Sequence, residues 1–160
     1  MLYLGLGVFA LIIIALDQFT KYLTVANIPL GDEIAAIPGL FHFTYIRNTG
    51  ASFSMLEGNG WLFIGVLILF TVILAVILKK KIIKKTFEIW CLAAVWGGGV
   101  GNAIDRIRLG YVVDMIEVEF MNFAVFNVAD IFICCGCFAL VVYVLFFDRD
   151  AAKSKKGEAE

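Results

Sequence analysis

The chain has 160 residues, of which 62% are hydrophobic and 17% are charged, and its mean hydropathy is +0.94 with a formal net charge of -1. A soluble domain has about 45–50% apolar and about 25% charged residues, so this composition predicts an integral membrane protein. No basic patch carries interleaved aromatic residues, and we therefore expect no nucleic-acid binding.

The first apolar run, about residues 2–26, is long enough to span a bilayer and has its polar residues near one end. A cleaved signal peptide is the alternative, but the start lacks a basic segment and no small-x-small site follows the apolar core. Asp17 and Lys21 are four residues apart and share one helical face, with the acid before the base. They form either a self-neutralising pair at the interface, with Lys21 extended toward water, or part of a polar site; these interpretations are compatible.

The stretch 29–58 does not continue the helical pattern and is expected outside the hydrocarbon or shielded by protein. It contains Pro29, Gly31, Pro38, Gly39 and Gly50. Aromatic residues at 41, 43 and 45 alternate with His42 and Thr44, which predicts a short strand. We therefore expect a small β element lying on the membrane. Arg47 and Asn48 are either solvated turn residues or part of a site.

Residues 60–78 form an uninterrupted apolar run of nineteen residues, about 28 Å as a helix, and predict a second span. Five lysines follow between Lys79 and Lys85 without an acid, which places that loop in the cytoplasm by the positive-inside rule. Both termini are then cytoplasmic and the 29–58 region is outside. Residues 149–160 are expected to be a disordered cytoplasmic tail.

Two further spans are expected at about 87–107 and 126–147. Gly97 and Gly101 have the spacing that permits close helix approach. Asn102, Asp105 and Arg106 lie near the outer end of the third span, and Asn127 and Asp130 share the first turn of the fourth. The predicted fold is thus a single α-helical membrane domain, residues 1–148, with four transmembrane helices and a small extracytoplasmic β element between the first two.

The four cysteines lie in apolar runs without paired CxxC spacing or nearby histidines. Free cysteine behaves as a small buried hydrophobe, and a zinc site needs ligands that this pattern lacks. We expect core or lipid-facing cysteines, and neither a metal site nor a cofactor.

Polar residues from four segments reach the same depth in the predicted bundle. Counting 1.5 Å per residue from Phe87 places Asp105 at the outer boundary. Asp114 lies in the following connection, Asp130 in the first turn of the next helix, and Asp17 at the outer end of the first. Charges in apolar surroundings are usually paired or functional, so this coincidence predicts a functional site.

Asp114 and Asp130 suit general acid–base catalysis. Two carboxylates in a low-dielectric site do not easily ionise together, so one retains a proton while the other activates a water, as in aspartic proteases. Which of them is protonated stays open here, and their apparent pKa values belong to the pair. Asn102, Asn127, Asp105 and Arg106 are suited to orienting the carboxylates and balancing their charge.

Five motifs, in this order, closely resemble those of the lipoprotein signal peptidases (signal peptidase II). They are DQFTK at 17–21, NTGASFS at 48–54, GNAIDR at 101–106, VVD at 112–114 and FNVAD at 126–130. The resemblance covers nearly the whole chain. The chain departs from the family pattern at Ser52, where Ala is frequent, and at Ile131, where Ser is frequent; neither replaces a carboxylate.

The resemblance implies that Asp114 and Asp130 are the catalytic pair. It implies that Asn48, Asn102, Asp105, Arg106 and Asn127 support the site and that Asp17 and Lys21 belong to the outer polar cluster. It also implies the substrate, a bacterial prolipoprotein whose lipobox cysteine carries diacylglycerol and which is cut just before that cysteine. The expected partners are this substrate and membrane lipids, and the expected state is a monomer in the cell membrane.

Three other functions are weighed against this one. A transporter would place its carboxylates near the bilayer midplane on broken helices, whereas these cluster at one surface. A serine–lysine peptidase would use Ser52 or Ser54 with Lys21 and would survive exchange of both aspartates for asparagine. A purely structural membrane protein would show no turnover.

Overall fold

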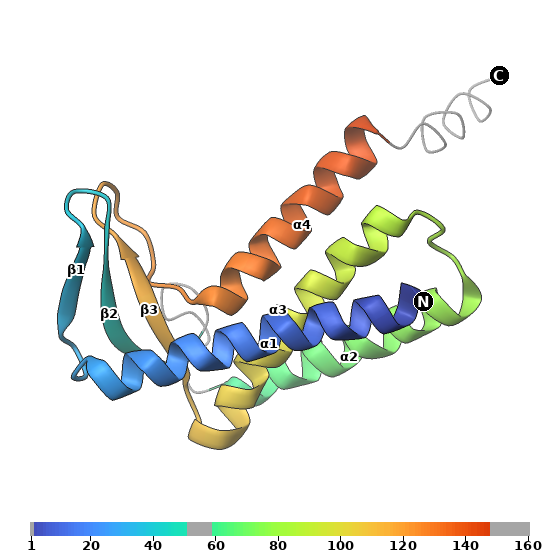
Figure 1. The fold of residues 1–160 in the computed structure, drawn as a ribbon. Coiled ribbons are helices and arrows are strands. Elements are labelled where there is room, and N and C mark those ends of the chain that lie inside the picture. The colour runs from blue at the N-terminus through green and yellow to red at the C-terminus, as the bar shows by residue number, and fades with distance from the viewer. Residues whose placement is uncertain (1, 51–58, 148–160) are drawn as a thin grey trace.

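The computed structural model describes residues 2–50 and 59–147. In chain order these residues form α1 (Leu2–Asn27), β1 (Glu33–Ile37), β2 (Phe41–Asn48), α2 (Gly60–Lys80), α3 (Thr86–Leu109), β3 (Val112–Val118) and α4 (Val128–Phe146). The four helices begin and end within two residues of the predicted boundaries. Figure 1 shows the helices as one bundle with the sheet at one end. The predicted tail, 149–160, lies outside the described residues.

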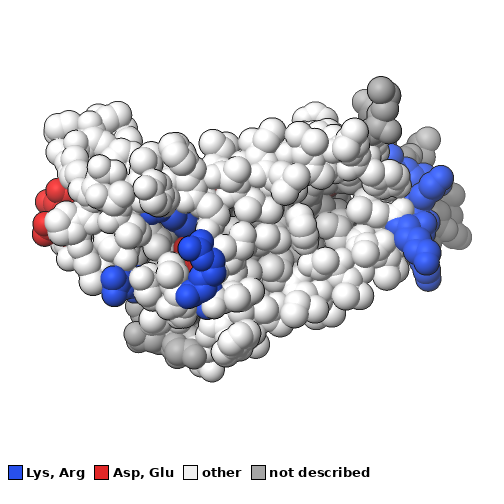
Figure 2. All heavy atoms as spheres, turned by 60° about the horizontal axis from the view of Figure 1, so that its bottom comes forward, with Lys and Arg blue, Asp and Glu red and all other residues white. Residues whose placement is uncertain are grey.

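Three of the helices in the described ranges, α1, α2 and α4, are long and apolar enough to cross a membrane. The 24-residue α3 is not one of them, because its C-terminal half carries the polar residues of the GNAIDR motif. α2 has no buried residue, although it is almost wholly apolar, as expected for a helix surrounded by lipid. In the face drawn in Figure 2, a broad band almost free of charged side chains separates Lys and Arg residues at the two ends. The chain is therefore a multi-pass membrane protein.

Small residues let α3 pack closely against the other helices. A Cβ on Gly98 would lie 2.5 Å from the Ala129 carbonyl oxygen of α4, and one on Gly101 would lie 2.6 Å from Asp17 Oδ2 of α1. A Cβ on Gly97 would meet Ile13 of α1 at 3.3 Å. Gly97 and Gly101 therefore both face α1, as their spacing predicted. α3 thereby packs closely against both α1 and α4 around residues 97–101.

The sheet is antiparallel with strand order β1-β2-β3. The alternating aromatic residues predicted β2 correctly, but Asp114 was expected in a connection between helices and instead lies in strand β3. Four consecutive residues of this strand, Val112 to Met115, are buried, so the period-two pattern that reveals a half-exposed strand is absent. A register irregularity between Phe43 and Ile46 lets Asn48 pair with Val112 at the end of the ladder. This pairing brings the end of β2 beside Asp114.

Candidate active site

Asp114 projects from β3 and is 2% exposed. Asn48 Nδ2 donates a hydrogen bond to Asp114 Oδ2 at 2.8 Å, and Asn127 Nδ2 donates to Asp114 Oδ1 at 2.6 Å. Each carboxylate oxygen thus has its own amide donor, from a different segment of the chain. The Asp114 carboxylate is therefore fixed in both position and rotation.

Asp130 is held by the N-terminal cap of α4. Asn127 is the N-cap residue, and its Oδ1 accepts the Asp130 backbone N–H at 3.0 Å. In return, Asp130 Oδ2 accepts the Asn127 backbone N–H at 3.2 Å, which completes a capping box. The other oxygen, Asp130 Oδ1, accepts a hydrogen bond from Asn102 Nδ2 at 2.8 Å. The predicted placement of Asn127 and Asp130 in one helical turn is confirmed.

The two carboxylates are joined by a chain of side-chain amides. Asn127 Nδ2 donates to Asn102 Oδ1 at 3.0 Å as well as to Asp114, so the order of contacts is Asp114, Asn127, Asn102, Asp130. Lys21 Nζ donates to the same Asn102 oxygen at 2.8 Å. A cation therefore sits one amide away from Asp130 and two amides away from Asp114.

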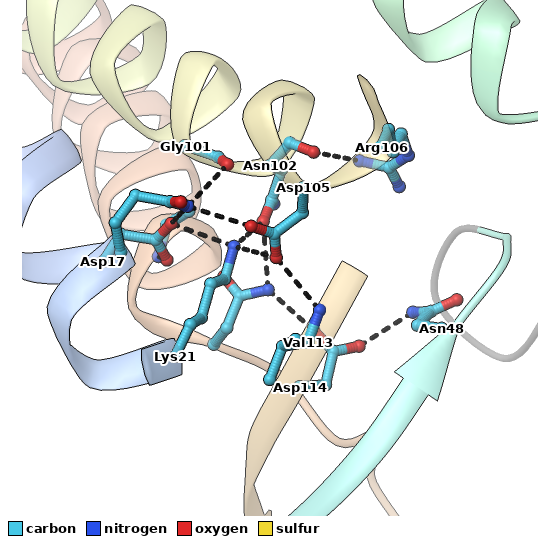
Figure 3. Close-up of polar contacts among 12 residues, drawn as sticks. Asp17, Lys21, Asn48, Gly101, Asn102, Asp105, Arg106, Val113 and Asp114 are labelled. Atoms are coloured by element: carbon cyan, nitrogen blue, oxygen red, sulfur yellow. Dashed lines mark hydrogen bonds and ion pairs between the residues drawn. The ribbon is translucent and has the colours of Figure 1, made fainter. Parts of the chain in front are cut away.

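Asp17 and Lys21 are buried beneath this chain of amides, at 0% and 3% exposure. Lys21 Nζ lies 2.9 Å from Asp17 Oδ2 and 3.1 Å from Asp105 Oδ2, and Figure 3 shows these groups converging from α1 and α3. The interpretation in which Lys21 extends toward water is therefore wrong, because three acceptors hold its ammonium group inside the protein. The interpretation of the pair as part of a polar site is the one that matches the structure.

The three polar residues near the end of α3 point in different directions. Asp105 turns toward α1 and also accepts the Val113 backbone N–H at 3.1 Å. Arg106 turns the other way; its Nη2 donates to the Gly50 carbonyl at 2.9 Å, and its guanidinium lies 4.4 Å from the centroid of the Phe63 ring. Asp105 and Arg106 thus find separate partners. Arg106 ties the segment just after Asn48 to the helices.

The sequence did not decide whether Arg47 and Asn48 are solvated turn residues or part of a site, and in the structure the two residues have different surroundings. Asn48 faces Asp114, whereas Arg47 Nε donates to the Tyr45 hydroxyl at 3.0 Å and its guanidinium lies 4.9 Å from the Tyr111 ring centroid. Arg47 therefore braces the sheet away from the carboxylates. Ser52 and Ser54, considered as alternative nucleophiles, lie outside the described residues.

The surroundings of Asp114 favour its protonated form. Burial in the protein, and then the neighbouring charge of Asp130, raise the pKa of Asp114 to about 6, although the hydrogen bonds from Asn48 and Asn127 oppose this shift. A carboxyl group with a pKa in this range can hold a proton in weakly acidic conditions and release it near neutrality.

A cavity of about 750 Å³ opens beside the carboxylates. Asp114, Asp130 and Asn48 line its polar end. Its remaining walls are mostly apolar and come from α2, α3, α4 and the segment 123–126 that precedes α4, with Phe63, Val66, Leu67, Phe70, Val95, Phe123, Phe126 and Ile133 among them. The cavity can therefore hold a bulky apolar ligand with one polar bond presented to the carboxylates.

Sequence reasoning missed one member of this polar cluster, Gln18. Its Nε2 lies within hydrogen-bond distance of both Asp17 and Asp105. The only signal in the sequence was a polar side chain next to Asp17 inside an apolar run. Within residues 2–50 and 59–147, no group of three or more metal-binding side chains is arranged to hold a metal ion.

Fold and site together define a class of protein, a multi-pass membrane enzyme with a paired-carboxylate site at one end of its helices. The family model described as signal peptidase (SPase) II matches residues 9–146. The chain belongs to this family.

Relatives and solved structures agree with this assignment. The chain is 41% identical over 146 residues to a lipoprotein signal peptidase of Enterococcus faecalis, covering 91% of each chain. It is 42% identical over 132 residues to one of Streptococcus thermophilus, covering 82% of this chain and 86% of the relative. A bacterial membrane enzyme solved at 2.3 Å has a TM-score of 0.83 at 28% identity, covering 88% of this chain and 87% of its own. Another, solved at 1.9 Å, has a TM-score of 0.80 at 29% identity, covering 90% and 94%.

Proposed function

We propose that this chain is an aspartyl endopeptidase of the membrane that removes signal peptides from prolipoproteins, with Asp114 and Asp130 as its catalytic pair. The observation that carries this proposal is the fixed carboxylate pair at the polar end of an apolar cavity. Membership in the signal peptidase II family and the names of the relatives point to the same activity.

The chemistry needs one protonated and one ionised carboxyl group. Asp130 takes a proton from water while the water oxygen bonds to the scissile carbonyl carbon, and Asp114, the group with the raised pKa, donates its proton to the carbonyl oxygen. The resulting diol then collapses. The C–N bond breaks as the leaving nitrogen receives the proton from Asp130, and a diol hydroxyl returns a proton to Asp114. One water is consumed, and both carboxyl groups regain their starting states.

The apolar lining of the cavity is evidence for a lipid-modified substrate. Its apolar walls lie between α2, α3 and α4 and can receive acyl chains or an apolar signal helix, while the scissile bond reaches the carboxylates at the polar end. A diacylglyceryl group on the lipobox cysteine would hold that bond at the membrane surface. The peptide bond just before the modified cysteine would then be presented at the depth of the carboxylates.

The same proposal includes an orientation. The lysine-rich loop between α2 and α3 lies at the end of the bundle opposite the sheet (Figure 1). With this loop in the cytoplasm, both termini are cytoplasmic and the carboxylates lie near the extracytoplasmic face. All the site residues come from one chain, so a monomer provides a complete site.

A serine–lysine mechanism does not match the surroundings of Lys21. A general-base lysine must contact the serine hydroxyl, but Lys21 Nζ is buried between two carboxylates and the Asn102 oxygen. These three acceptors hold the Lys21 amino group inside the polar cluster. Lys21 is therefore suited to balancing charge in the site.

The deciding experiment is cleavage of a diacylglyceryl-modified lipobox peptide in detergent by the wild type, Asp114→Asn and Asp130→Asn. We expect the wild type to cut before the modified cysteine and each variant to lose at least about 1,000-fold in kcat, since each loses an acid or base needed for turnover. Thermal melting of each variant checks that it is folded. Near wild-type turnover in either folded variant would contradict the catalytic pair, and an inactive wild type would contradict the peptidase function.

A further inference from the structure

Two carboxylates outside the proposed catalytic pair bind the backbone next to it in the same way. Asp17 Oδ1 accepts the backbone N–H of Ala129 at 2.9 Å, one residue before Asp130. Asp105 Oδ2 accepts the backbone N–H of Val113 at 3.1 Å, again one residue before the other member of the pair. The position of each catalytic carboxylate therefore depends on a buried carboxylate of α1 or α3.

These two supporting carboxylates are in turn held together by side chains of α1. Lys21 Nζ contacts Asp17 at 2.9 Å and Asp105 at 3.1 Å. Gln18 Nε2 contacts Asp17 Oδ2 at 3.2 Å and Asp105 Oδ1 at 3.0 Å, and it also lies 3.1 Å from the Gly101 carbonyl oxygen. Two side chains from one turn of α1, Lys21 and Gln18, thus each connect Asp17 to Asp105.

We propose that Gln18 is a positioning residue that, together with Lys21, sets the separation of Asp114 and Asp130 through the Asp17 and Asp105 carboxylates. This inference rests on the proposed function, in which that separation governs turnover. A change of about 1 Å at a reacting group can lower a rate about 100-fold, so a bridge that never touches the substrate can still control kcat.

Lys21 alone does not contact every oxygen of the two carboxyl groups. Its Nζ reaches Asp17 Oδ2 and Asp105 Oδ2, whereas Asp105 Oδ1 accepts its hydrogen bond from Gln18 Nε2. Gln18 adds N–H groups between the two carboxyl groups without adding another charge. It is only half-buried at the edge of the cluster, whereas Lys21 is buried. Without the Gln18 amide, the groups that make the Lys21 contacts and both backbone contacts are still present, so the protein should fold while the spacing of the two carboxylates relaxes.

The test compares Gln18→Ala, Gln18→Glu and the control Asn27→Ala in the same lipopeptide assay. Asn27 is an exposed amide of the same helix whose Nδ2 donates only to the Leu23 carbonyl, at 2.7 Å, among the contacts described. We expect Gln18→Ala to lower kcat at least about 10-fold with KM within about twofold, and Asn27→Ala to match the wild type. A kcat within twofold of the wild type in Gln18→Ala would overturn the proposal.

Gln18→Glu adds a readout that general damage to the fold would not produce. Ionised Glu has no donor and repels both carboxylates, but protonated Glu has the shape of Gln and an O–H that can donate. The activity of Gln18→Glu relative to the wild type should therefore rise as pH falls, whereas the ratio for Gln18→Ala should stay flat. Parallel pH dependence of the two ratios would count against positioning by hydrogen bonding.

A measurement without turnover separates this inference from the proposed function. If Gln18→Ala lets the pair move apart by about 1 Å, the Asp130 charge acts less strongly on Asp114, whose pKa should fall by about half a unit. Carboxyl NMR signals of the protein with labelled aspartate report this titration, and Asn27→Ala serves again as the control. An inactive wild type would refute the peptidase function alone, and an unchanged Asp114 titration in Gln18→Ala would refute the positioning role.

Discussion

The side-chain amide of Asn127 lies 2.6 Å from Asp114 Oδ1, so the N-cap residue of α4 is also a hydrogen-bond donor to strand β3. The same side chain accepts the backbone N–H of Asp130 at 3.0 Å. Asn127 is 0% exposed, and its one amide group therefore fixes both proposed catalytic residues. The Asn127 side chain consequently both caps α4 and aligns Asp114 with Asp130.

The two roles of Asn127 can be separated by substitution. Asp can replace Asn as an N-cap, whereas Ala cannot, and loss of a cap costs about 0.5–2 kcal/mol. We expect Asn127→Ala to lower the melting temperature and activity. Asn127→Asp should keep the cap but replace the donor to Asp114 with a third carboxylate, so that kcat falls at least about 100-fold. Melting curves and kcat are the measurements, and substantial turnover by Asn127→Asp would show that its donor N–H is dispensable.

Asp114 should reduce the stability of the protein as pH rises. Its pKa is about 6 in the folded state, mainly because of burial, against an ordinary value of 3.8. The folded state therefore binds more protons than the unfolded state between these values, and the free energy of unfolding falls as pH increases through this window. The full effect, about 3 kcal/mol above pH 6, is absent below about pH 4.

Asp114→Asn removes this ionisation, and its melting temperature should therefore rise relative to the wild type as pH goes from 4 to 7.5. The comparison across pH cancels any constant effect of the altered hydrogen bonds with Asn48 and Asn127. The difference in melting temperature between Asp114→Asn and the wild type is measured in detergent at pH 4 and pH 7.5. A difference between variant and wild type that does not change with pH would contradict the raised pKa of Asp114.

The polar positions on the helices could be predicted because an apolar run makes each charged residue conspicuous. Counting helical rise from Phe87 placed Asp105 at the same end as Asp17 and Asp130. In the structure Lys21 contacts both Asp17 and Asp105, and Asn102 connects Lys21 to Asp130. Strand β3 could not be predicted in this way, since Val112 to Met115 are buried without alternation.

Contacts between side chains and the backbone also could not be predicted from the sequence. Asp17 binds the amide of Ala129, 112 residues away, and a backbone N–H has no signature in a residue pattern. The contacts of Gln18 with α3 were also missed, because the relative rotation of α1 and α3 is fixed only by packing. Lys21 was expected in a polar cluster, where its contacts place it, but its burial was not foreseen.

Because Gly98 is closely packed, we expect even the small substitution Gly98→Ala to reduce activity. A Cβ there would lie 2.5 Å from the Ala129 carbonyl oxygen and 2.8 Å from Ile133 Cγ1, so α3 and α4 must separate. Overpacking of this kind costs about 1–3 kcal/mol. We expect Gly98→Ala to lower the melting temperature and to lower kcat further than stability alone requires, because Ala129 precedes Asp130.

Gly65→Ala is the matched control for this effect. Gly65 lies in α2, and nothing is within 4 Å of its added Cβ. Since Ala favours a helix more than Gly does, the control should melt at the same temperature as the wild type or slightly higher and keep its kcat. Equal effects of the two substitutions would show that the α3–α4 contact is not the cause.

His42 links the three strands of the sheet through carboxylates. Its Nε2 lies 3.2 Å from Glu33 of β1 and 3.1 Å from Glu117 of β3, and its Nδ1 lies 3.4 Å from Glu119. Partial desolvation of the imidazole lowers its pKa, but the hydrogen bonds that it donates to Glu117 and Glu119 and the charges of Glu33 and Glu117 outweigh this effect. The net result is a pKa of His42 above its ordinary value of 6.5.

A raised pKa in the folded state means that protonated His42 stabilises the sheet. This contribution is fully present below pH 6.5, the ordinary value, and is lost as pH rises through the higher folded-state pKa of His42. We therefore expect His42→Gln to melt below the wild type at pH 6 and to approach it at pH 9, where Gln replaces a neutral imidazole. Melting curves across this range provide the measurement. A deficit that grows toward alkaline pH would show instead that neutral His42 is the stabilising form and that the three glutamates do not hold its proton.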